Sequence, residues 1–201
     1  MESKFSAVVF RAQQHGEYDK LLKLITKDGV VSAIIKGVRR AKAKLKPCAL
    51  PFAFFEYTAV KKGDLYVVTG ASQIEDLHGL SACPQKLTAG SIILESAAAC
   101  FGSGFDGHFI IMLKKLKDII YGLNPFTPAI RFLQHMIHSG GYGYEYEKYN
   151  KIETPLQLLS YLHYSAEDGE FDEKLILKTL AKLIISFENI FECTVLSKIM
   201  L

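Results

Sequence analysis

The strongest chemical signal in the chain is a run of positive charge between residues 36 and 46. Six of these eleven residues are basic and none is acidic. A polyanion such as nucleic acid is the natural partner of such a run, because each neutralised phosphate releases condensed counterions. The alternative is a solvated loop whose charges only keep the protein soluble. The six basic residues are Lys36, Arg39, Arg40, Lys42, Lys44 and Lys46.

The segments on either side of this run predict that it projects from a β-sheet. A segment rich in β-branched residues ends at Gly37, and an apolar β-like segment follows from residue 51 to residue 60. These flanks favour a charged connector between two strands over a tail. We therefore expect all six basic residues to contact DNA, with Arg39 and Arg40 first, because the guanidinium fork matches the geometry of phosphate better than a lysine does.

The first third of the chain predicts about five β-strands. Asp28-Gly29 is a strong hairpin signal, and residues 18–26 fit a strand or a helix equally well. Five strands in so short a span fit a barrel of the OB type, which binds oligonucleotides on one face and through its loops. The expected strands cover residues 5–10, 18–26, 30–36, 52–60 and 65–74.

The remainder of the chain predicts helices after a linker at residues 77–84. Apolar residues recur there at spacings of three and four. The expected helices cover residues 85–100, 106–121, 125–139, 155–164, 172–191 and, as a short final helix, 193–201. The predicted fold class is α+β, with a five-stranded OB-type β-barrel over residues 1–78 followed by an all-α helical domain over residues 79–201.

Composition and charge agree with a folded protein that has a basic N-terminal part. Hydrophobic residues make up 49% and charged residues 22%. Residues 1–78 hold 13 basic and 8 acidic residues, whereas residues 79–201 hold 11 and 13. No apolar run reaches the roughly 18 residues that span a bilayer, and no secretory signal is evident. The four cysteines are scattered, so we expect reduced, mostly buried thiols, a cytoplasmic location and no membrane partner.

No motif predicts catalysis, a cofactor or a metal site. Residues 102–107 match GxGxxG, but a helix-like segment precedes them where a nucleotide site needs a strand. The acidic residues between 167 and 173 are interpreted as capping and solvation. His135 and His138 share a helix face, yet no second pair completes a zinc site. Four tyrosines between residues 142 and 149 could stack on bases, but interleaved glutamates favour packing onto the helices.

Several short segments in the first 52 residues form a recognisable pattern. They are Arg11, Gly16-Glu17-Tyr18-Asp19, Leu24-Ile25-Thr26-Lys27-Asp28-Gly29, Ile35-Lys36-Gly37-Val38-Arg39-Arg40, Lys44-Leu45 and Leu50-Pro51-Phe52. The order and spacing of these residues resemble the RecO family of bacterial recombination mediators. Farther along the chain, Arg131-Phe132 and Gly141-Tyr142-Gly143 resemble the family's central helix and the turn after it. The resemblance implies an N-terminal OB-fold and a C-terminal helical domain.

The resemblance also implies a role without enzymatic activity. Proteins of this family bind single- and double-stranded DNA, anneal complementary strands and help load RecA onto DNA coated by single-strand-binding protein (SSB). They act with RecR, at the nucleoid during repair, and many contact the acidic, hydrophobic C-terminal tail of SSB. In this chain Arg131 is the candidate partner for the carboxylate of that tail. Many members also carry a four-cysteine zinc motif, but residues 144–150 contain no cysteine, so we expect packing to replace the metal here.

The leading hypothesis is a DNA-binding mediator of recombination and repair. Two alternatives stay open at this point. One is a general RNA- or single-strand-binding OB protein, which would prefer RNA. The other is a protein–protein adaptor whose basic loop meets an acidic partner, which would bind an acidic peptide and no oligonucleotide.

Overall fold

The computed structural model describes residues 2–100, 107–143, 145–149, 151–165 and 169–200. These residues form a closed β-barrel followed by helices, which confirms the predicted α+β class. The chain divides into two compact units, one of residues 1–79 with 101–109 and the other of residues 80–100 with 110–201. The predicted domain boundary at residue 78 stays a prediction.

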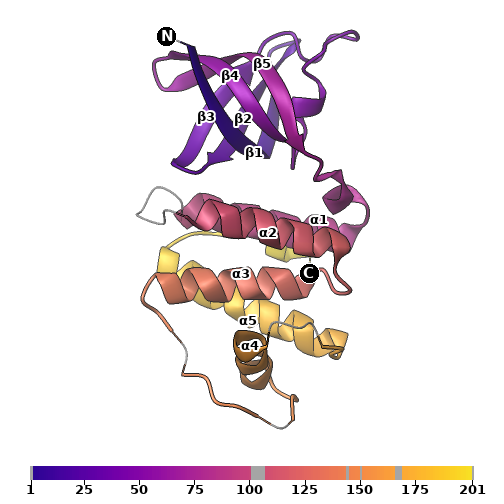
Figure 1. Cartoon of the computed structure of the whole chain (residues 1–201), viewed down its shortest axis with the longest axis vertical. Helices are drawn as coiled ribbons and strands as arrows, with labels where there is room; N and C mark the ends of the chain where they lie inside the picture. The colour runs from indigo at the N-terminus through magenta and orange to yellow at the C-terminus, as the bar shows by residue number, and fades with distance from the viewer. Residues whose placement is uncertain (1, 101–106, 144, 150, 166–168, 201) are drawn as a thin grey trace. The chain divides into compact units, whose positions relative to one another are not determined.

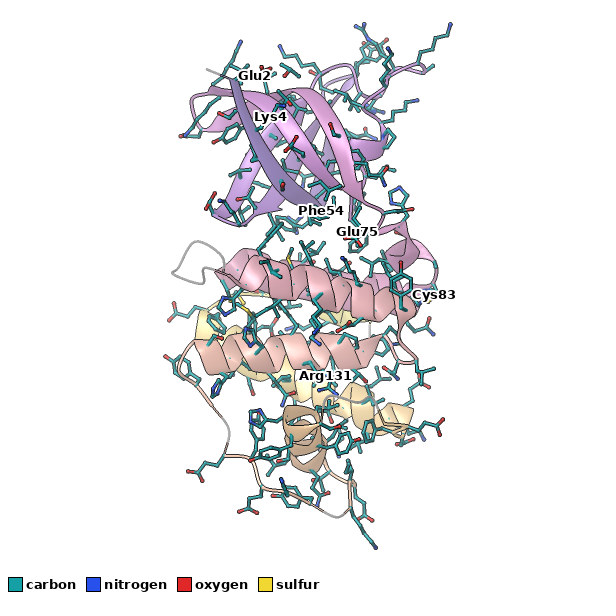
Figure 2. All side chains as sticks on the ribbon, in the orientation of Figure 1. Glu2, Lys4, Phe54, Glu75, Cys83 and Arg131 are labelled. Atoms are coloured by element: carbon teal, nitrogen blue, oxygen red, sulfur yellow. The ribbon has the colours of Figure 1, made fainter. Side chains whose placement is uncertain are left out.

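The barrel consists of five strands in the order β1-β2-β3-β5-β4, closed by pairing of β1 with β4 (Figure 1). All neighbours are antiparallel except β3 and β5, which run parallel. This is the strand order of an OB-type barrel. Figure 2 labels Glu2 at the start of β1 and Phe54 at the start of β4, the two strands that close the barrel. The strands are β1 (Glu2–His15), β2 (Asp19–Thr26), β3 (Gly29–Ile35), β4 (Phe54–Lys62) and β5 (Leu65–Glu75).

Side chains alternate along these strands between the barrel core and the outside, as the two-residue period of a strand requires. The inward residues pack around the buried ring of Tyr57. Irregular pairing between Val9 and Arg11 in β1, and at two places in β4, bends the strands; such bulges help a sheet to close. The inward residues of the first three strands include Ala7, Val9, Leu22, Leu24, Ala33 and Ile35.

Two predicted features of the first hairpins are wrong in detail. β1 runs from Glu2 to His15, beyond both ends of the strand expected over residues 5–10. The added residues include polar ones such as Gln13, which lies on the exposed side of the strand, so an apolar pattern did not mark them. In the second hairpin the loop residues are Lys27 and Asp28, and Gly29 is the first residue of β3, with φ 126°.

After the barrel, the described residues form five α-helices and two short 3-10 helices, the first of which spans the boundary between the two units. α3 carries ten buried residues and contacts α1, α4 and α5 (Figure 1). Five of the predicted helices are confirmed to within two residues at their described ends. The last one, expected over residues 193–201, is a 3-10 helix that begins only at Leu196. The elements are η2 (His78–Ser81), α1 (Pro84–Cys100), α2 (His108–Tyr121), α3 (Phe126–Ser139), α4 (Pro155–Tyr164), α5 (Glu173–Phe191) and η3 (Leu196–Met200).

Local sequence explains where the last two α-helices begin. At α4 the Thr154 hydroxyl accepts from the backbone N–H of Gln157, and the Gln157 side chain accepts from the backbone N–H of Thr154. This is a capping box, and Pro155 occupies the first turn, where its missing N–H is harmless. At α5 the Asp172 carboxylate accepts from the N–H of Leu175 at 3.2 Å, and a negative charge suits a helix N-terminus.

Across the described parts of the chain, no helix is both long and apolar enough to cross a membrane.

Candidate nucleic-acid interface

The six predicted cations lie together on the loop that leads from β3 toward β4. We call residues 36–46 the basic connector. All six basic side chains are exposed, whereas Val38 is buried in the barrel core and Leu45 packs against it. The apolar residues of the connector therefore hold it on the barrel, and its charged residues face solvent. The 3-10 helix η1 (Pro47–Ala49) completes the path back to the barrel.

The first half of the basic connector is bound to the turn between β1 and β2. The backbone N–H of Gly37 donates to the Asp19 carboxylate at 2.7 Å. The backbone N–H of Arg39 donates to the carbonyl of Tyr18 at 2.9 Å, and its guanidinium donates to the carbonyl of Glu17 at 2.8 Å. These contacts join two loops that are about 20 residues apart in sequence. The loop is consequently ordered before any ligand arrives.

The residues that follow the basic connector are bound to the barrel through their backbone carbonyls. The buried hydroxyl of Tyr57 donates to the carbonyl of Cys48 at 2.7 Å, and Lys20 donates to the carbonyl of Ala49 at 2.9 Å. Within the basic connector, Lys46 donates to the carbonyl of Ala41 at 2.9 Å. Hydrogen bonds thus hold the start of the basic connector and the η1 segment just after its end.

The six cations do not have equal freedom to bind an anion. Lys36, Lys42 and Lys44 make no side-chain hydrogen bond or ion pair with any residue that the structure describes. Arg39, by contrast, uses its guanidinium to hold the β1–β2 turn, and Arg40 lies 5.1 Å from the ring centroid of Tyr18. A guanidinium has five N–H donors, so both arginines keep donors for a further partner.

Other basic residues of the barrel divide into exposed and structural ones. Arg11 and Lys23 are exposed and directly opposite each other on β1 and β2, and Lys23 donates to the Ser32 hydroxyl at 2.7 Å. Lys27 is exposed in the β2–β3 turn. Lys20 is half-buried and donates to the carbonyl of Ala49 in η1, as described above. Arg11, Lys23 and Lys27 thus add positive charge to the outside of the barrel.

Two buried groups beside the basic connector, the Cys48 thiol and the Tyr57 hydroxyl, are uncharged at neutral pH. Burial raises the pKa of the Cys48 thiol to about 11, although a backbone hydrogen bond partly offsets this effect. Burial also raises the pKa of Tyr57, and the charge of a neighbouring Cys48 thiolate acts in the same direction. All four cysteines are free, with Cys48 and Cys100 buried and the other two half-buried. Two of the four are therefore buried, fewer than the mostly buried set that was predicted.

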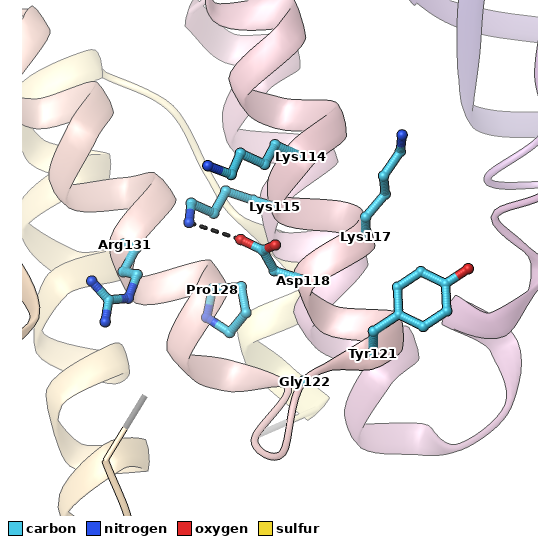
Figure 3. Close-up of a pocket in the computed structure, with 8 residues that line it drawn as sticks. All are labelled: Lys114, Lys115, Lys117, Asp118, Tyr121, Gly122, Pro128 and Arg131. Carbon is cyan, nitrogen blue, oxygen red and sulfur yellow. Dashed lines mark hydrogen bonds and ion pairs between the residues drawn. The ribbon is translucent and has the colours of Figure 1, made fainter. Parts of the chain in front are cut away.

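Arg131, the residue predicted to bind a partner, lies in the other unit and has a structural contact. Its guanidinium donates to the carbonyls of Leu162 and Ser165, both at 2.6 Å, at the C-terminal end of α4. A cation there also complements the partial negative charge of a helix C-terminus. Arg131 lines a pocket of about 400 Å³ between α2 and α3 (Figure 3).

Three lysines that the sequence interpretation did not select share this pocket with Arg131. They are Lys114, Lys115 and Lys117 on α2, and Lys115 pairs with Asp118 at 2.8 Å (Figure 3). Pro128 and Tyr121 give the pocket apolar surface. Four basic side chains and one carboxylate make the pocket suitable for an anion with an apolar neighbour. The signal in the sequence was the Lys-Lys-Leu-Lys segment of α2.

The remaining candidates give no second site. Among the residues with described positions, no group of three histidine, cysteine, aspartate or glutamate side chains could hold a metal ion. Tyr146 stacks on His163, with ring centroids 4.4 Å apart, and its hydroxyl accepts from Gln134 at 3.0 Å. Tyr146 therefore packs onto the helices. Tyr144, most of the GxGxxG segment and two of the acids predicted to cap a helix lie outside the described residues.

The strand order and the helical unit together define an OB-fold protein with an α-helical extension. Comparison with known proteins gives a more specific result. Residues 1–76 match the family model described as "Recombination protein O N terminal". Over 151 residues the chain is 28% identical to the DNA repair protein RecO of Clostridium novyi, which covers 72% of this chain and 58% of that relative.

Two further relatives agree with this match. The RecO of Clostridium kluyveri is 24% identical over 80% of this chain and 64% of its own length. The RecO of Alkaliphilus metalliredigens is 31% identical over 46% of this chain and 38% of its own length. The chain is therefore similar to these RecO proteins, and its first 76 residues match the N-terminal part of that family. It spans less than two thirds of the length of these relatives.

Proposed function

We propose that this protein is a non-enzymatic, DNA-binding mediator of recombination in DNA repair. The observation that carries the proposal is the basic connector, whose six exposed cations are displayed on a backbone held at its start and just after its end. The relatives named as DNA repair proteins support the same role. Lys36, Lys42 and Lys44 would bind phosphates directly. Arg39 and Arg40 contact the β1–β2 turn with only part of each guanidinium group. Their remaining N–H donors would bind phosphate.

Such a site suits binding without sequence preference and the annealing of complementary strands. Contacts to phosphate carry no sequence information. Two strands repel each other through their phosphates, and a protein that neutralises this charge on both lowers the barrier to pairing. The same contacts would serve single- and double-stranded DNA.

The helical unit would provide the contacts to other proteins of the pathway. Under this proposal these are RecR, the C-terminal tail of SSB and, indirectly, RecA. The pocket around Arg131 supports the second of these, because it combines basic side chains with apolar surface, and an acidic, hydrophobic tail has the complementary chemistry.

The test is a salt series of binding to a fluorescent single-stranded oligonucleotide. The variant Lys36→Ala/Lys42→Ala/Lys44→Ala removes the three cations without side-chain partners. Each lost phosphate contact flattens the log–log salt dependence by about 0.7 for single strands, so the expected change in slope is about 2, with weaker binding. Duplex DNA should show the same direction of change.

The chain offers a control with the same change in net charge. Lys174, Lys178 and Lys182 are exposed on α5, so Lys174→Ala/Lys178→Ala/Lys182→Ala should leave the slope unchanged. Equal slopes for the wild type and the connector variant would move the DNA site elsewhere. A wild-type protein that binds an acidic peptide and no oligonucleotide would instead support an adaptor, and a clear preference for RNA would support an RNA-binding protein.

A further inference from the structure

Tyr18 is an exposed aromatic residue beside the basic connector. It lies in the turn between β1 and β2, and 42% of its surface is exposed. The guanidinium of Arg40 lies 5.1 Å from its ring centroid. An aromatic ring that stays this exposed contributes little to the barrel core. Its position beside several cations gives it a surface that a ligand could use.

The backbone around this ring is fixed by contacts that do not involve the ring itself. The carbonyl of Tyr18 accepts from the N–H of Arg39 at 2.9 Å. On either side, the carbonyl of Glu17 accepts from the Arg39 guanidinium, and the carboxylate of Asp19 accepts from the N–H of Gly37. The Asp19 carboxylate is thereby engaged and less available to repel an anion. A ligand that uses the ring would pay little ordering entropy.

We infer that Tyr18 is a stacking platform for an unpaired nucleobase, with Arg40 binding the phosphate next to that base. Stacking tolerates any sequence, since every base has a π-face. A base in a duplex has both faces covered by its neighbours, so the platform serves only single strands. This inference rests on the proposed DNA-binding function. Under this inference Tyr18 gives the protein a preference for single-stranded DNA. The cations of the basic connector bind single-stranded and double-stranded DNA alike.

The experiment compares the affinity of the full chain for a single-stranded oligonucleotide and for a hairpin duplex. Tyr18→Leu keeps an apolar side chain but removes the ring. The expected result is a loss of about 5- to 150-fold in affinity for the single strand, with duplex affinity and the salt slope unchanged. Tyr18→Phe should retain the wild-type affinities. Tyr142→Leu is the matched control, because Tyr142 is also exposed, at 57%, but lies in the helical unit.

The outcomes separate this inference from the proposed function. Equal losses on single-stranded and duplex DNA, together with a flatter salt slope, would mean that the substitution only disturbs Arg40, and would overturn the stacking role. Unchanged binding to both forms would overturn it as well. In each case the wild-type protein still binds DNA, so the proposed function stands. A wild-type protein that binds neither form would overturn both.

Discussion

At the scale of single residues, Gly37 meets two requirements at the start of the basic connector. Its φ of 65° lies in the left-handed region, where a side chain is unfavourable, and its N–H donates to Asp19. A Cβ at this position would lie at an ordinary contact distance of 3.7 Å from the side chain of Arg40, so the requirement for glycine comes from the backbone conformation. The path of the whole charged loop therefore depends on one residue without a side chain.

We predict that Gly37→Ala destabilises the barrel by about 1–2 kcal/mol, because alanine is strained in the left-handed region. Thermal unfolding measures the effect. Gly70→Ala is the matched control in β5, where the nearest atoms would lie at an ordinary contact distance of 3.7 Å, and it should be close to neutral. An equal fall in Tm for both variants would contradict this explanation.

At the scale of secondary structure elements, cations stabilise the C-terminal ends of helices in the second unit. Lys86 donates to the carbonyl of Ile120 near the end of α2, at 2.6 Å, and Arg131 does the same at α4. The last turn of a helix exposes unpaired carbonyls with partial negative charge. Arg131 would thus serve both the packing of α4 and the pocket next to it, which makes Arg131→Ala a poor test of peptide binding.

A third cation links the end of α5 to η3. Lys198 contacts the carboxylate of Glu188, and that carboxylate also accepts from the N–H of Val195 at 2.8 Å. Burial alone would raise the pKa of Glu188. The hydrogen bonds from Lys198 and Val195, with the charge of Lys198, outweigh it and hold the pKa below the ordinary 4.5.

The lowered pKa predicts how Glu188→Gln depends on pH. The folded state stabilises the ionised carboxylate of Glu188. Its contribution to the free energy of unfolding is therefore present above the pKa that the group has in the unfolded state, and it is lost as the pH falls through the lower pKa of the folded state. The variant should lose about 1 kcal/mol at pH 7 and less at pH 3, as measured by Tm at both values. Glu192→Gln, at an exposed neighbour, is the control. If the difference in Tm between the wild type and Glu188→Gln is the same at both pH values, the charge of Glu188 is not the source of the stabilisation.

At the scale of the whole molecule, charge is divided between the two parts of the sequence, with a net of +5 over residues 1–78 and −2 over residues 79–201. The pocket around Arg131 is therefore a local basic site in a region that is slightly acidic overall. Lys114 makes no side-chain hydrogen bond or ion pair with a described residue, and Lys115 pairs with Asp118 on the same helix. Neither holds two helices together as Arg131 does, so these two lysines are the better targets for a test.

We predict that Lys114→Ala/Lys115→Ala weakens the binding of an acidic, hydrophobic peptide with a free C-terminal carboxylate. Two lost charge contacts at a partly exposed site should lower the affinity by roughly tenfold. Fluorescence anisotropy with a labelled peptide measures this. Lys174→Ala/Lys178→Ala on α5 has the same change in net charge and should bind normally. Equal affinity of the wild type and both variants would exclude this pocket.

The sequence was sufficient for the strand and helix pattern, but not for the contacts between loops. The β-branched segments, the apolar spacings of three and four, and the helix that begins at residue 155 were visible in it. The hydrogen bonds from Arg39 to Glu17 and Tyr18 use backbone carbonyls, which every residue has, so no residue pattern marks them. The stacking role of Tyr18 was also missed. It depends on the basic connector lying beside the ring, and the sequence does not show that the two loops meet.

The buried and exposed positions of the basic connector have a consequence for its tolerance to mutation. Lys42 and Lys44 are exposed and make no side-chain hydrogen bond or ion pair with a described residue, so replacing either with arginine should not affect folding. Gly37, Val38 and Leu45 have no such freedom, since each is tied to the barrel. Over evolutionary time such a loop can keep its total charge while its individual cations change places.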